Sequence, residues 1–189
     1  MLKRRMGFCV CGSYCSFSRI LDELSRLCDT YDVPPILSEA SATTDTRFGS
    51  AQAFRKEIEA LTGKPAITTI PDAEPIGPGA LFDVLVVAPC TGNTLAKLAA
   101  GVTDSSVTMA AKAHLRNGRP IILAISTNDG LAGSGANIGA LLNRKHYYFV
   151  PFFQDDAENK PCSLLADFKQ IKASLEAAAQ EQQVQPILR

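Results

Sequence analysis

Short apolar runs alternate along the chain with longer stretches in which apolar residues recur every three to four positions. The short runs are typical of strands, and the recurring pattern is typical of helices with one apolar face. Strands are therefore expected at residues 6–11, 35–37, 66–70, 83–88, 120–125 and 147–150. Helices are expected at residues 18–31, 54–61, 91–100, 105–117, 137–143 and 163–179.

Glycine, proline and serine mark where several of these elements begin or end. Gly63 and Gly101 are expected to close two helices, and Pro89 is expected to end the strand at residues 83–88. Ser16 or Ser18 is expected to cap the first helix. Residues 38–48 and 71–78 are rich in polar residues and prolines respectively, which predicts loops with at most one helical turn in the second.

The alternation of strands and helices from end to end predicts a doubly wound α/β fold with a parallel sheet of about six strands. Ligands bind such sheets beyond the carboxyl ends of the strands. The chain has 189 residues, which fits a single domain over residues 1–189. Residues 1–5 and 180–189 are expected to be flexible or docked on a partner.

Composition narrows the classes of partner. The chain has 19 Lys plus Arg and 19 Asp plus Glu, so no global field favours nucleic acid or an anionic membrane. No apolar stretch reaches the roughly 20 residues of a membrane helix and no export signal is recognised, which predicts a cytoplasmic protein. The six cysteines show no paired C-x-x-C spacing, so free thiols are expected, with neither a disulfide framework nor a metal site.

Hydroxyl, amide and glycine residues follow the predicted strands, at the edge where a ligand is expected. Such uncharged groups, together with the free N–H groups of a helix start, can hold a phosphate by hydrogen bonds. The alternative is that these residues serve only as helix caps and turn formers. The residues are Gly12, Ser13, Ser38, Pro89, Cys90, Thr91, Gly92, Asn93, Thr94, Ser126, Thr127, Asn128 and Asp129.

Common nucleotide and hydrolase motifs are missing from the sequence. The turn at Gly12 lacks the further glycines of G-x-G-x-x-G, and no G-K-S or G-K-T occurs. Ser134 stands between two glycines but not in G-x-S-x-G, and neither histidine follows a predicted strand. His114, in a predicted helix, is expected to be at the surface or half-buried. Dinucleotide binding, ATP binding by these motifs and Ser-His-Asp hydrolysis are therefore disfavoured.

One long run carries a family resemblance. Residues 86–104 read Val-Val-Ala-Pro-Cys-Thr-Gly-Asn-Thr-Leu-Ala-Lys-Leu-Ala-Ala-Gly-Val-Thr-Asp, and this run resembles a motif of the homo-oligomeric flavin-containing decarboxylase family. Other segments resemble the branch of that family that takes part in dipicolinate synthesis, so the resemblance covers nearly the whole chain. These segments are residues 46–49, 73–78, 113–117, 126–131, 150–156 and 183–186.

The resemblance implies a three-layer α/β/α, flavodoxin-like (Rossmann-like) protein that carries FMN and forms a homo-oligomer, a trimer or a multiple of it. It also implies a partner, the A subunit of the synthase, that resembles an NAD(P)-dependent dehydrogenase. Together the two proteins would oxidise a small dicarboxylate, the dihydrodipicolinate-pathway intermediate, to dipicolinate in spore-forming bacteria. By position, Gly12, Ser13 and Ser38 match phosphate-side contacts of the family. The segment matching contacts to the phosphate and isoalloxazine comprises Pro89, Thr91, Gly92, Asn93 and Thr94.

Several residues are candidates to face a substrate, although no catalytic residue is assigned. A guanidinium pairs with a carboxylate in bidentate fashion, so Arg47, with Arg116 or Lys112, is a candidate to bind carboxylates. The alternative is an ordinary solvated charge. Cys90, at a helix start, would be a nucleophile if its pKa were lowered, and would otherwise pack beside a cofactor. The substrate-facing candidates are Arg47, Cys90, Asn128 and Asp129.

Three functions stay open at this point. The chain is the FMN-binding component of an oxidoreductase, or a non-catalytic partner with a vestigial flavin site that stabilises the dehydrogenase-like protein. The third alternative is a stand-alone FMN-dependent decarboxylase or transferase. Flavin bound to the purified chain favours the first function over the second.

Overall fold

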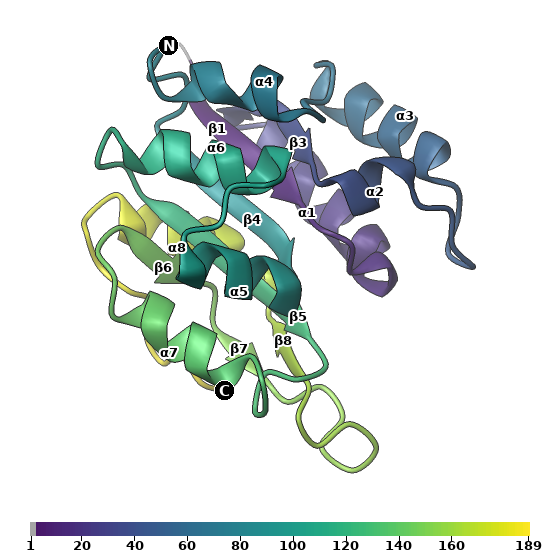
Figure 1. The fold of residues 1–189 in the computed structure, drawn as a ribbon, viewed down its shortest axis with the longest axis vertical. Helices are drawn as coiled ribbons and strands as arrows, with labels where there is room; N and C mark the ends of the chain where they lie inside the picture. Colours follow the sequence, from purple (N-terminus) through teal and green to yellow (C-terminus); the bar gives the residue numbers. More distant parts are fainter. Residues whose placement is uncertain (1–2) are drawn as a thin grey trace.

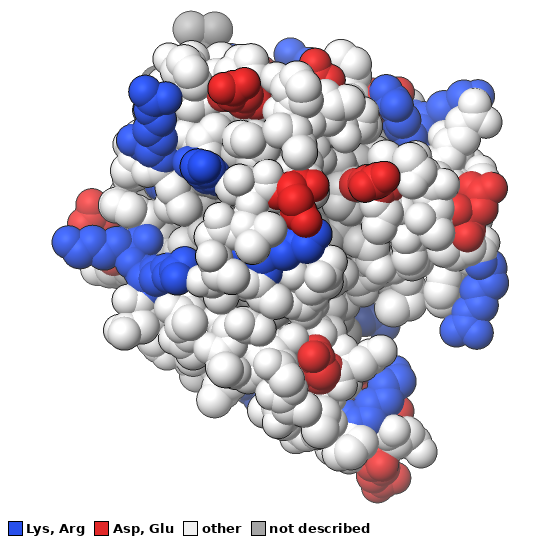
Figure 2. Space-filling view, viewed as in Figure 1, with Lys and Arg blue, Asp and Glu red and all other residues white. Residues whose placement is uncertain are grey.

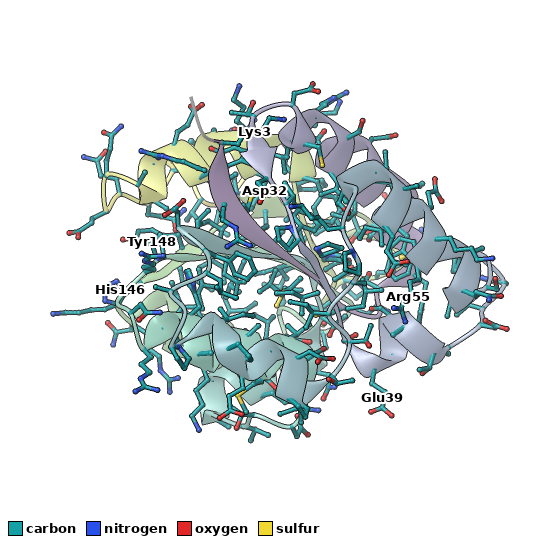
Figure 3. The ribbon with its side chains drawn as sticks, turned by 90° about the horizontal axis from the view of Figure 1, so that it is seen from above. Lys3, Asp32, Glu39, Arg55, His146 and Tyr148 are labelled. Atoms are coloured by element: carbon teal, nitrogen blue, oxygen red, sulfur yellow. The ribbon has the colours of Figure 1, made fainter. Side chains whose placement is uncertain are left out.

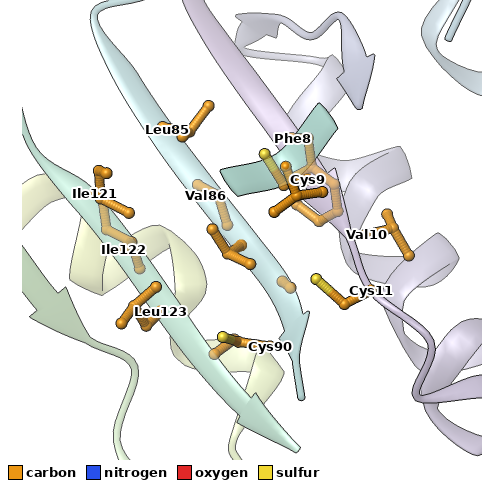
Figure 4. Packing of buried hydrophobic residues seen from close by; sticks show 14 of the residues in the cluster. Phe8, Cys9, Val10, Cys11, Leu85, Val86, Cys90, Ile121, Ile122 and Leu123 are labelled. Carbon is orange, nitrogen blue, oxygen red and sulfur yellow. The ribbon is translucent and has the colours of Figure 1, made fainter. Parts of the chain in front are cut away.

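Three apolar runs form the centre of an eight-stranded sheet in the computed structural model, which describes residues 3–189. β4 (Val84–Cys90) lies between β1 (Arg4–Val10) and β5 (Ile121–Thr127), and the three strands run parallel. Every residue of β4 is buried, as expected for a strand covered on both faces. Figure 4 shows apolar side chains of these strands packed against one another.

The edges of the sheet differ from each other. On one side, β1 pairs in parallel with β2 (Tyr31–Asp32) and β3 (Pro35–Leu37). On the other side, β5 pairs in parallel with β6 (Tyr147–Phe149) along its first half. The last residues of β5 instead pair antiparallel with β8 (Leu164–Ala166), which in turn pairs antiparallel with β7 (Phe152–Phe153). The predicted sheet is confirmed, but it is mostly rather than wholly parallel.

Helices cover both faces of the sheet, which confirms the predicted three-layer arrangement. In Figure 1, α5 (Gly92–Ala100), α6 (Ser106–Leu115) and α7 (Gly135–Leu142) lie in front of the sheet, and α1 (Phe17–Cys28) and α8 (Ile171–Ala178) lie behind it. No helix among residues 3–189 is long and apolar enough to cross a membrane. The remaining helical segments are α2 (Glu39–Thr43), α3 (Ala51–Thr62), α4 (Ile70–Ala73) and the 3-10 turns η1 (Tyr14–Ser16), η2 (Glu74–Ile76) and η3 (Phe168–Gln170).

Several predicted elements are wrong in extent or type. The loop predicted at residues 38–48 contains α2, and residues 71–78 hold more than the one helical turn expected there, since α4 continues into η2. The strand predicted at residues 66–70 is a single bridge from Ile67 to Ile36, because the Thr69 side chain caps α4 there. The helix predicted at residues 163–179 begins with β8, since pairing with the end of β5 overrides its helical periodicity. β4 does not end at Pro89 but continues to Cys90 through a shift in register after Val87.

The C-terminal tail, residues 180–189, packs against its own chain. The Gln183 side chain accepts a hydrogen bond from the Phe149 N–H and donates one to the Phe149 carbonyl, each at 2.7 Å. Farther along, the Phe152 N–H donates to the Ile187 carbonyl at 2.9 Å. The tail therefore lies against its own chain in the structure, and its docking on a partner stays a prediction. At the other end, β1 already includes Arg4, while residues 1–2 of the expected flexible end lie outside the described residues.

Candidate functional site

A cleft of about 610 Å³ lies at the carboxyl ends of β1, β4 and β5. The turns that follow parallel strands all lie at this edge of the sheet, and ligands bind doubly wound sheets there. The cleft joins the predicted segments that follow each of the three strands. Its lining from those segments consists of Gly12, Ser13, Tyr14, Cys15, Ser16, Thr91, Gly92, Ser126, Thr127 and Asn128.

Three serine hydroxyls link the turn after β1 to the end of β5. Ser126 Oγ lies 2.7 Å from Ser13 Oγ and 3.1 Å from Ser16 Oγ. Ser16 stands at the start of α1, but its side chain makes no capping hydrogen bond, so the predicted capping role of Ser16 is wrong. The hydroxyl is instead committed to the cluster, which holds the turn in place at the floor of the cleft.

Backbone N–H groups remain available on two sides of the cleft. Those of Tyr14 and Cys15 donate to no other described residue, and neither do those of Gly92 and Asn93 at the start of α5. Helix starts leave such donors free, and they attract anionic and carbonyl oxygens. Arg19, on the first turns of α1, adds a positive charge to the lining.

The start of α5 is held by two threonines. The Thr91 side chain accepts a hydrogen bond from the Thr94 N–H, and the two hydroxyls lie 3.1 Å apart. Thr94 is buried and does not line the cleft. Its role is therefore to orient Thr91. Asn93 is exposed and does not line the cleft, and the group that it can offer at the start of α5 is its free backbone N–H.

Gly92 leaves no room for a side chain. A Cβ built there would lie 2.5 Å from Ser134 Oγ, 2.6 Å from Thr127 Oγ1 and 2.8 Å from Asp129 Oδ1. The Thr127 and Ser134 hydroxyls both donate to Asp129 Oδ1, and these hydrogen bonds lower the pKa of Asp129 below its usual value. A fixed carboxylate therefore lies behind α5 next to the cleft, although Asp129 is not part of its lining.

Three other predicted site residues stand behind the lining. Ser38 caps α2 by accepting from the Ser41 N–H, and the Pro89 carbonyl accepts from the Cys11 N–H at 3.3 Å. Cys90 is fully buried, and burial raises its pKa well above the usual range, with the neighbouring Cys11 and Cys9 adding to the effect. Cys90 is therefore not among the residues that line the cleft, and the raised pKa disfavours the alternative of a thiolate nucleophile, because the side chain lies inside the core (Figure 4).

The opposite wall of the cleft brings together two loops that are far apart in sequence. Arg47 lines it from the loop after α2, with its guanidinium carbon 4.9 Å from the centre of the Phe48 ring. Lys160 lines it from the loop between β7 and β8, with Nζ 3.6 Å from Asp155 Oδ2. Sequence reasoning found Arg47 but missed Lys160, because the hairpin that positions it was not predicted.

The other basic candidates lie elsewhere. Lys112 lines a separate pocket at the C-terminal end of α5, and Arg116 ends α6 outside the cleft. His114 is buried rather than exposed or half-buried, which corrects the expectation. Its Nε2 lies 3.0 Å from the Pro120 carbonyl, while its Nδ1 is enclosed without a partner among the described residues. Burial lowers the pKa of His114 to about 4, so the ring is neutral at pH 7.

Comparisons with known proteins place this geometry in a family. The sequence model of the family described as Flavoprotein matches residues 1–136. The chain is 43% identical over 186 residues to the B subunit of dipicolinate synthase from Bacillus subtilis (strain 168), covering 98% of this chain and 93% of that protein. The crystal structure of the dipicolinate synthase B subunit from Bacillus halodurans C superposes with a TM-score of 0.91 at 40% identity, covering 100% of this chain and 97% of that one.

A more distant structure shares the fold alone. The FMN binding protein AtHal3 superposes with a TM-score of 0.68 at 16% identity, covering 96% of this chain and 100% of that chain. The family match spans well over half of the sequence, and the two dipicolinate synthase relatives align nearly from end to end. The chain therefore belongs to the flavoprotein family and is a homologue of the B subunit of dipicolinate synthase.

Proposed function

We propose that this chain is the FMN-carrying subunit of a dipicolinate synthase and acts with a dehydrogenase-like partner, the A subunit, which carries NAD(P). The two proteins together oxidise the dihydrodipicolinate-pathway intermediate to dipicolinate. The observation that carries the proposal is the convergence of free N–H groups and hydroxyls on one cleft, with Gly92 packed too closely to accept a Cβ. The homology to the B subunit of dipicolinate synthase supports the choice of reaction.

The residues present fit a flavin mononucleotide. The cleft volume of about 610 Å³ falls within the range of about 300–1,000 Å³ typical of small-molecule sites. Most of its lining is uncharged and rich in hydrogen-bond donors, which suits both a phosphate and the polar edge of a flavin ring. FMN, when bound, supplies an acceptor for two electrons.

The charges in and beside the cleft support one orientation of the cofactor. Asp129 already places a carboxylate against the start of α5, so a phosphate is disfavoured there. The other side of the cleft offers the free N–H groups of Tyr14 and Cys15 with Arg19 nearby. We therefore assign the phosphate to the turn at residues 12–16, and the ring to Thr91 and Gly92.

The remaining cations are suited to a dicarboxylate. Arg47 and Lys160 line the wall that faces the cofactor side, and each comes from a loop rather than from the sheet. The charge of Lys160 is partly neutralised by its ion pair with Asp155, whereas Arg47 forms no ion pair within 4 Å among residues 3–189. Arg47 is thus the group that orients a substrate carboxylate, with Lys160 as the second contact. The same proposal includes a cytoplasmic homo-oligomer that functions in sporulation.

Flavin titration and an omission assay test the proposal. The purified chain is titrated with FMN, and dipicolinate formation with NAD(P) is then measured with both proteins, and with either one omitted. We expect stoichiometric flavin binding and product only when both proteins are present. A chain that takes up no FMN yet raises the turnover of the dehydrogenase-like partner would instead be a non-catalytic partner. Decarboxylation or prenyl transfer by the isolated chain would assign it to a stand-alone enzyme.

A further inference from the structure

Another pocket, of about 370 Å³, opens at the C-terminal end of α5, whereas the cleft lies at the start of that helix. It lies between the C-terminal end of α5, the exposed side of α6 and the turn that leads from α7 into β6. Figure 3 shows His146 and Tyr148, the two neighbours of Tyr147 in the sequence, on the other side of the molecule from Glu39 and Arg55 of α2 and α3. None of its lining residues lines the cleft, so this is a separate site.

The wall of the pocket is apolar and its rim is cationic. Leu98, Val102 and Leu115 supply the apolar surface, and Val102 is 41% exposed. Lys112 and Lys145 stand at the rim, and neither forms an ion pair within 4 Å in the part of the chain that the structure describes. The lining contains no Asp or Glu among the described residues. Figure 2 shows Lys and Arg side chains gathered on the side where α6 and β6 lie in Figure 1.

A third cation is held in a fixed position. Arg144 donates from Nη1 to the Leu98 carbonyl at 3.1 Å and from Nη2 to the Ala99 carbonyl at 2.6 Å. These bonds satisfy the last carbonyls of α5 and fix the guanidinium beside the pocket. Because a guanidinium has five N–H donors, further donors stay available to a ligand.

Tyr147 provides a hydroxyl that has no partner. The residue is 8% exposed and lines the pocket, and its hydroxyl forms no hydrogen bond with a described residue. The one side-chain polar atom that is both enclosed and unpartnered among residues 3–189 is Nδ1 of His114. The Tyr147 hydroxyl is therefore not fully enclosed, and Tyr147 is one of the residues that line this pocket. Burial raises the pKa of Tyr147 to about 12, so the hydroxyl remains a donor at neutral pH.

We infer that this pocket binds a small organic anion with an apolar body, such as an aryl-substituted carboxylate. The apolar part lies against Leu98 and Val102, and the carboxylate accepts from the Tyr147 hydroxyl and pairs with Lys112 and Lys145. A neutral ligand of the same shape loses both the ion pairs and the charge-assisted hydrogen bond. The site is independent of the flavin cleft and of the proposed function.

Titration with 4-phenylbutyrate tests the site, with 4-phenylbutan-1-ol as the neutral match. Binding to the full chain is followed by calorimetry and by NMR signals of the probe. We expect the carboxylate to bind at least about tenfold more tightly than the alcohol, because hydrogen bonds to a charged group contribute about 1.5–3 kcal/mol. Saturating FMN is expected to leave 4-phenylbutyrate bound, since the cleft is a different site.

Matched variants identify the residues. Tyr147→Phe is expected to weaken 4-phenylbutyrate binding about three- to tenfold, while Tyr148→Phe, one position away, leaves it unchanged. Lys112→Ala with Lys145→Ala is expected to remove the preference over the alcohol, while Lys56→Ala on α3 keeps it. Thermal unfolding of each variant verifies that it is folded. No binding by the wild-type chain, equal affinity for the alcohol, displacement by FMN, or equal effects of Tyr147→Phe and Tyr148→Phe would each overturn the inference.

Discussion

Ser13 and Ser126 are 113 positions apart in the sequence, and their hydroxyl oxygens lie 2.7 Å from each other. The hydrogen bond joins the turn after β1 to the end of β5 across the carboxyl end of β4. Ser126 is also bonded to Ser16, so a single side chain positions both ends of the turn that lines the cleft.

A double-mutant cycle measures this link. Ser13→Ala and Ser126→Ala are each expected to lower the free energy of unfolding by about 1 kcal/mol, because each breaks a partly buried hydrogen bond. The double variant is expected to be less destabilised than the sum, by about 0.5–1.5 kcal/mol. Urea unfolding of the four proteins gives the coupling. Strict additivity would mean that the hydroxyl pair does not act as a unit.

Gly92→Ala tests whether the start of α5 is packed as closely as described. The new Cβ would lie 2.5–2.8 Å from three side-chain oxygens. We expect a loss of about 1–3 kcal/mol in unfolding free energy and at least tenfold weaker FMN binding, because α5 must shift. Gly139→Ala is the matched control, since a Cβ on that residue of α7 meets nothing within 4 Å. That variant is expected to bind FMN normally and to be slightly more stable. Equal behaviour of the two variants would contradict the prediction.

Arg47 is predicted to act on substrate binding more than on turnover. Arg47→Ala is expected to raise KM for the dicarboxylate about tenfold or more, with a smaller change in kcat, since it removes a carboxylate contact. Arg47→Lys is expected to restore only part of the affinity, because an ammonium cannot form the bidentate pair. Arg55→Ala, which breaks a surface pair with Glu59 outside the cleft, serves as the control in steady-state assays. An unchanged KM in Arg47→Ala would remove this residue from the substrate site.

His114 makes stability depend on acidic pH. Its pKa is about 4 in the folded chain, against a usual value of 6.5, because burial disfavours the charged ring. Below pH about 6.5 the unfolded state binds a proton that the folded state does not, so stability falls towards pH about 4 and is fully present above 6.5. The slope approaches about 1.4 kcal/mol per pH unit within that window. Urea unfolding of wild type and His114→Phe between pH 4.5 and 7.5 is the measurement, and an identical slope in the variant would refute it.

Gln183 is predicted to anchor the tail. Gln183→Ala leaves both backbone groups of Phe149 without their side-chain partner, which is expected to cost about 1–3 kcal/mol in unfolding free energy. Gln182→Ala, at an exposed neighbouring position, is expected to change stability by less than about 0.5 kcal/mol. Limited proteolysis should likewise cleave the tail faster only in Gln183→Ala. Resistance equal to wild type would show that the tail is held by other contacts.

The sequence was sufficient to predict the layers and much of the cleft for a physical reason. Parallel strands that are buried on both faces have continuous apolar sequences, so they can be recognised. The residues that follow such strands lie at the same edge of the sheet, and this predicts that Ser13, Thr91 and Asn128 are close together. The orientation of side chains at that edge was not predictable. Cys90 follows the same rule in sequence, but the register shift in β4 turns its thiol into the core.

The loop that carries Lys160 was not predicted, because the local helical periodicity of the following segment conflicts with its long-range strand pairing. Residues 163–179 have the periodicity of one continuous helix, and nothing in them signals a strand. Leu164 and Leu165 nevertheless pair with Thr127 and Ser126, a contact whose partners are far away in sequence. Local pattern reasoning does not include such pairings, so the hairpin and its loop were outside its reach.

The two halves of β5 pair with different strands, so one half belongs to the folding core and the other positions residues that can contact a ligand. The first half of the strand is bound to the parallel core, whereas its last two residues pair with the hairpin of β7 and β8. Changes in length or composition between Phe153 and Leu164 would alter what meets a ligand in the cleft while leaving the core ladder intact. Related proteins can thus acquire new ligand preferences by exchanging this one segment.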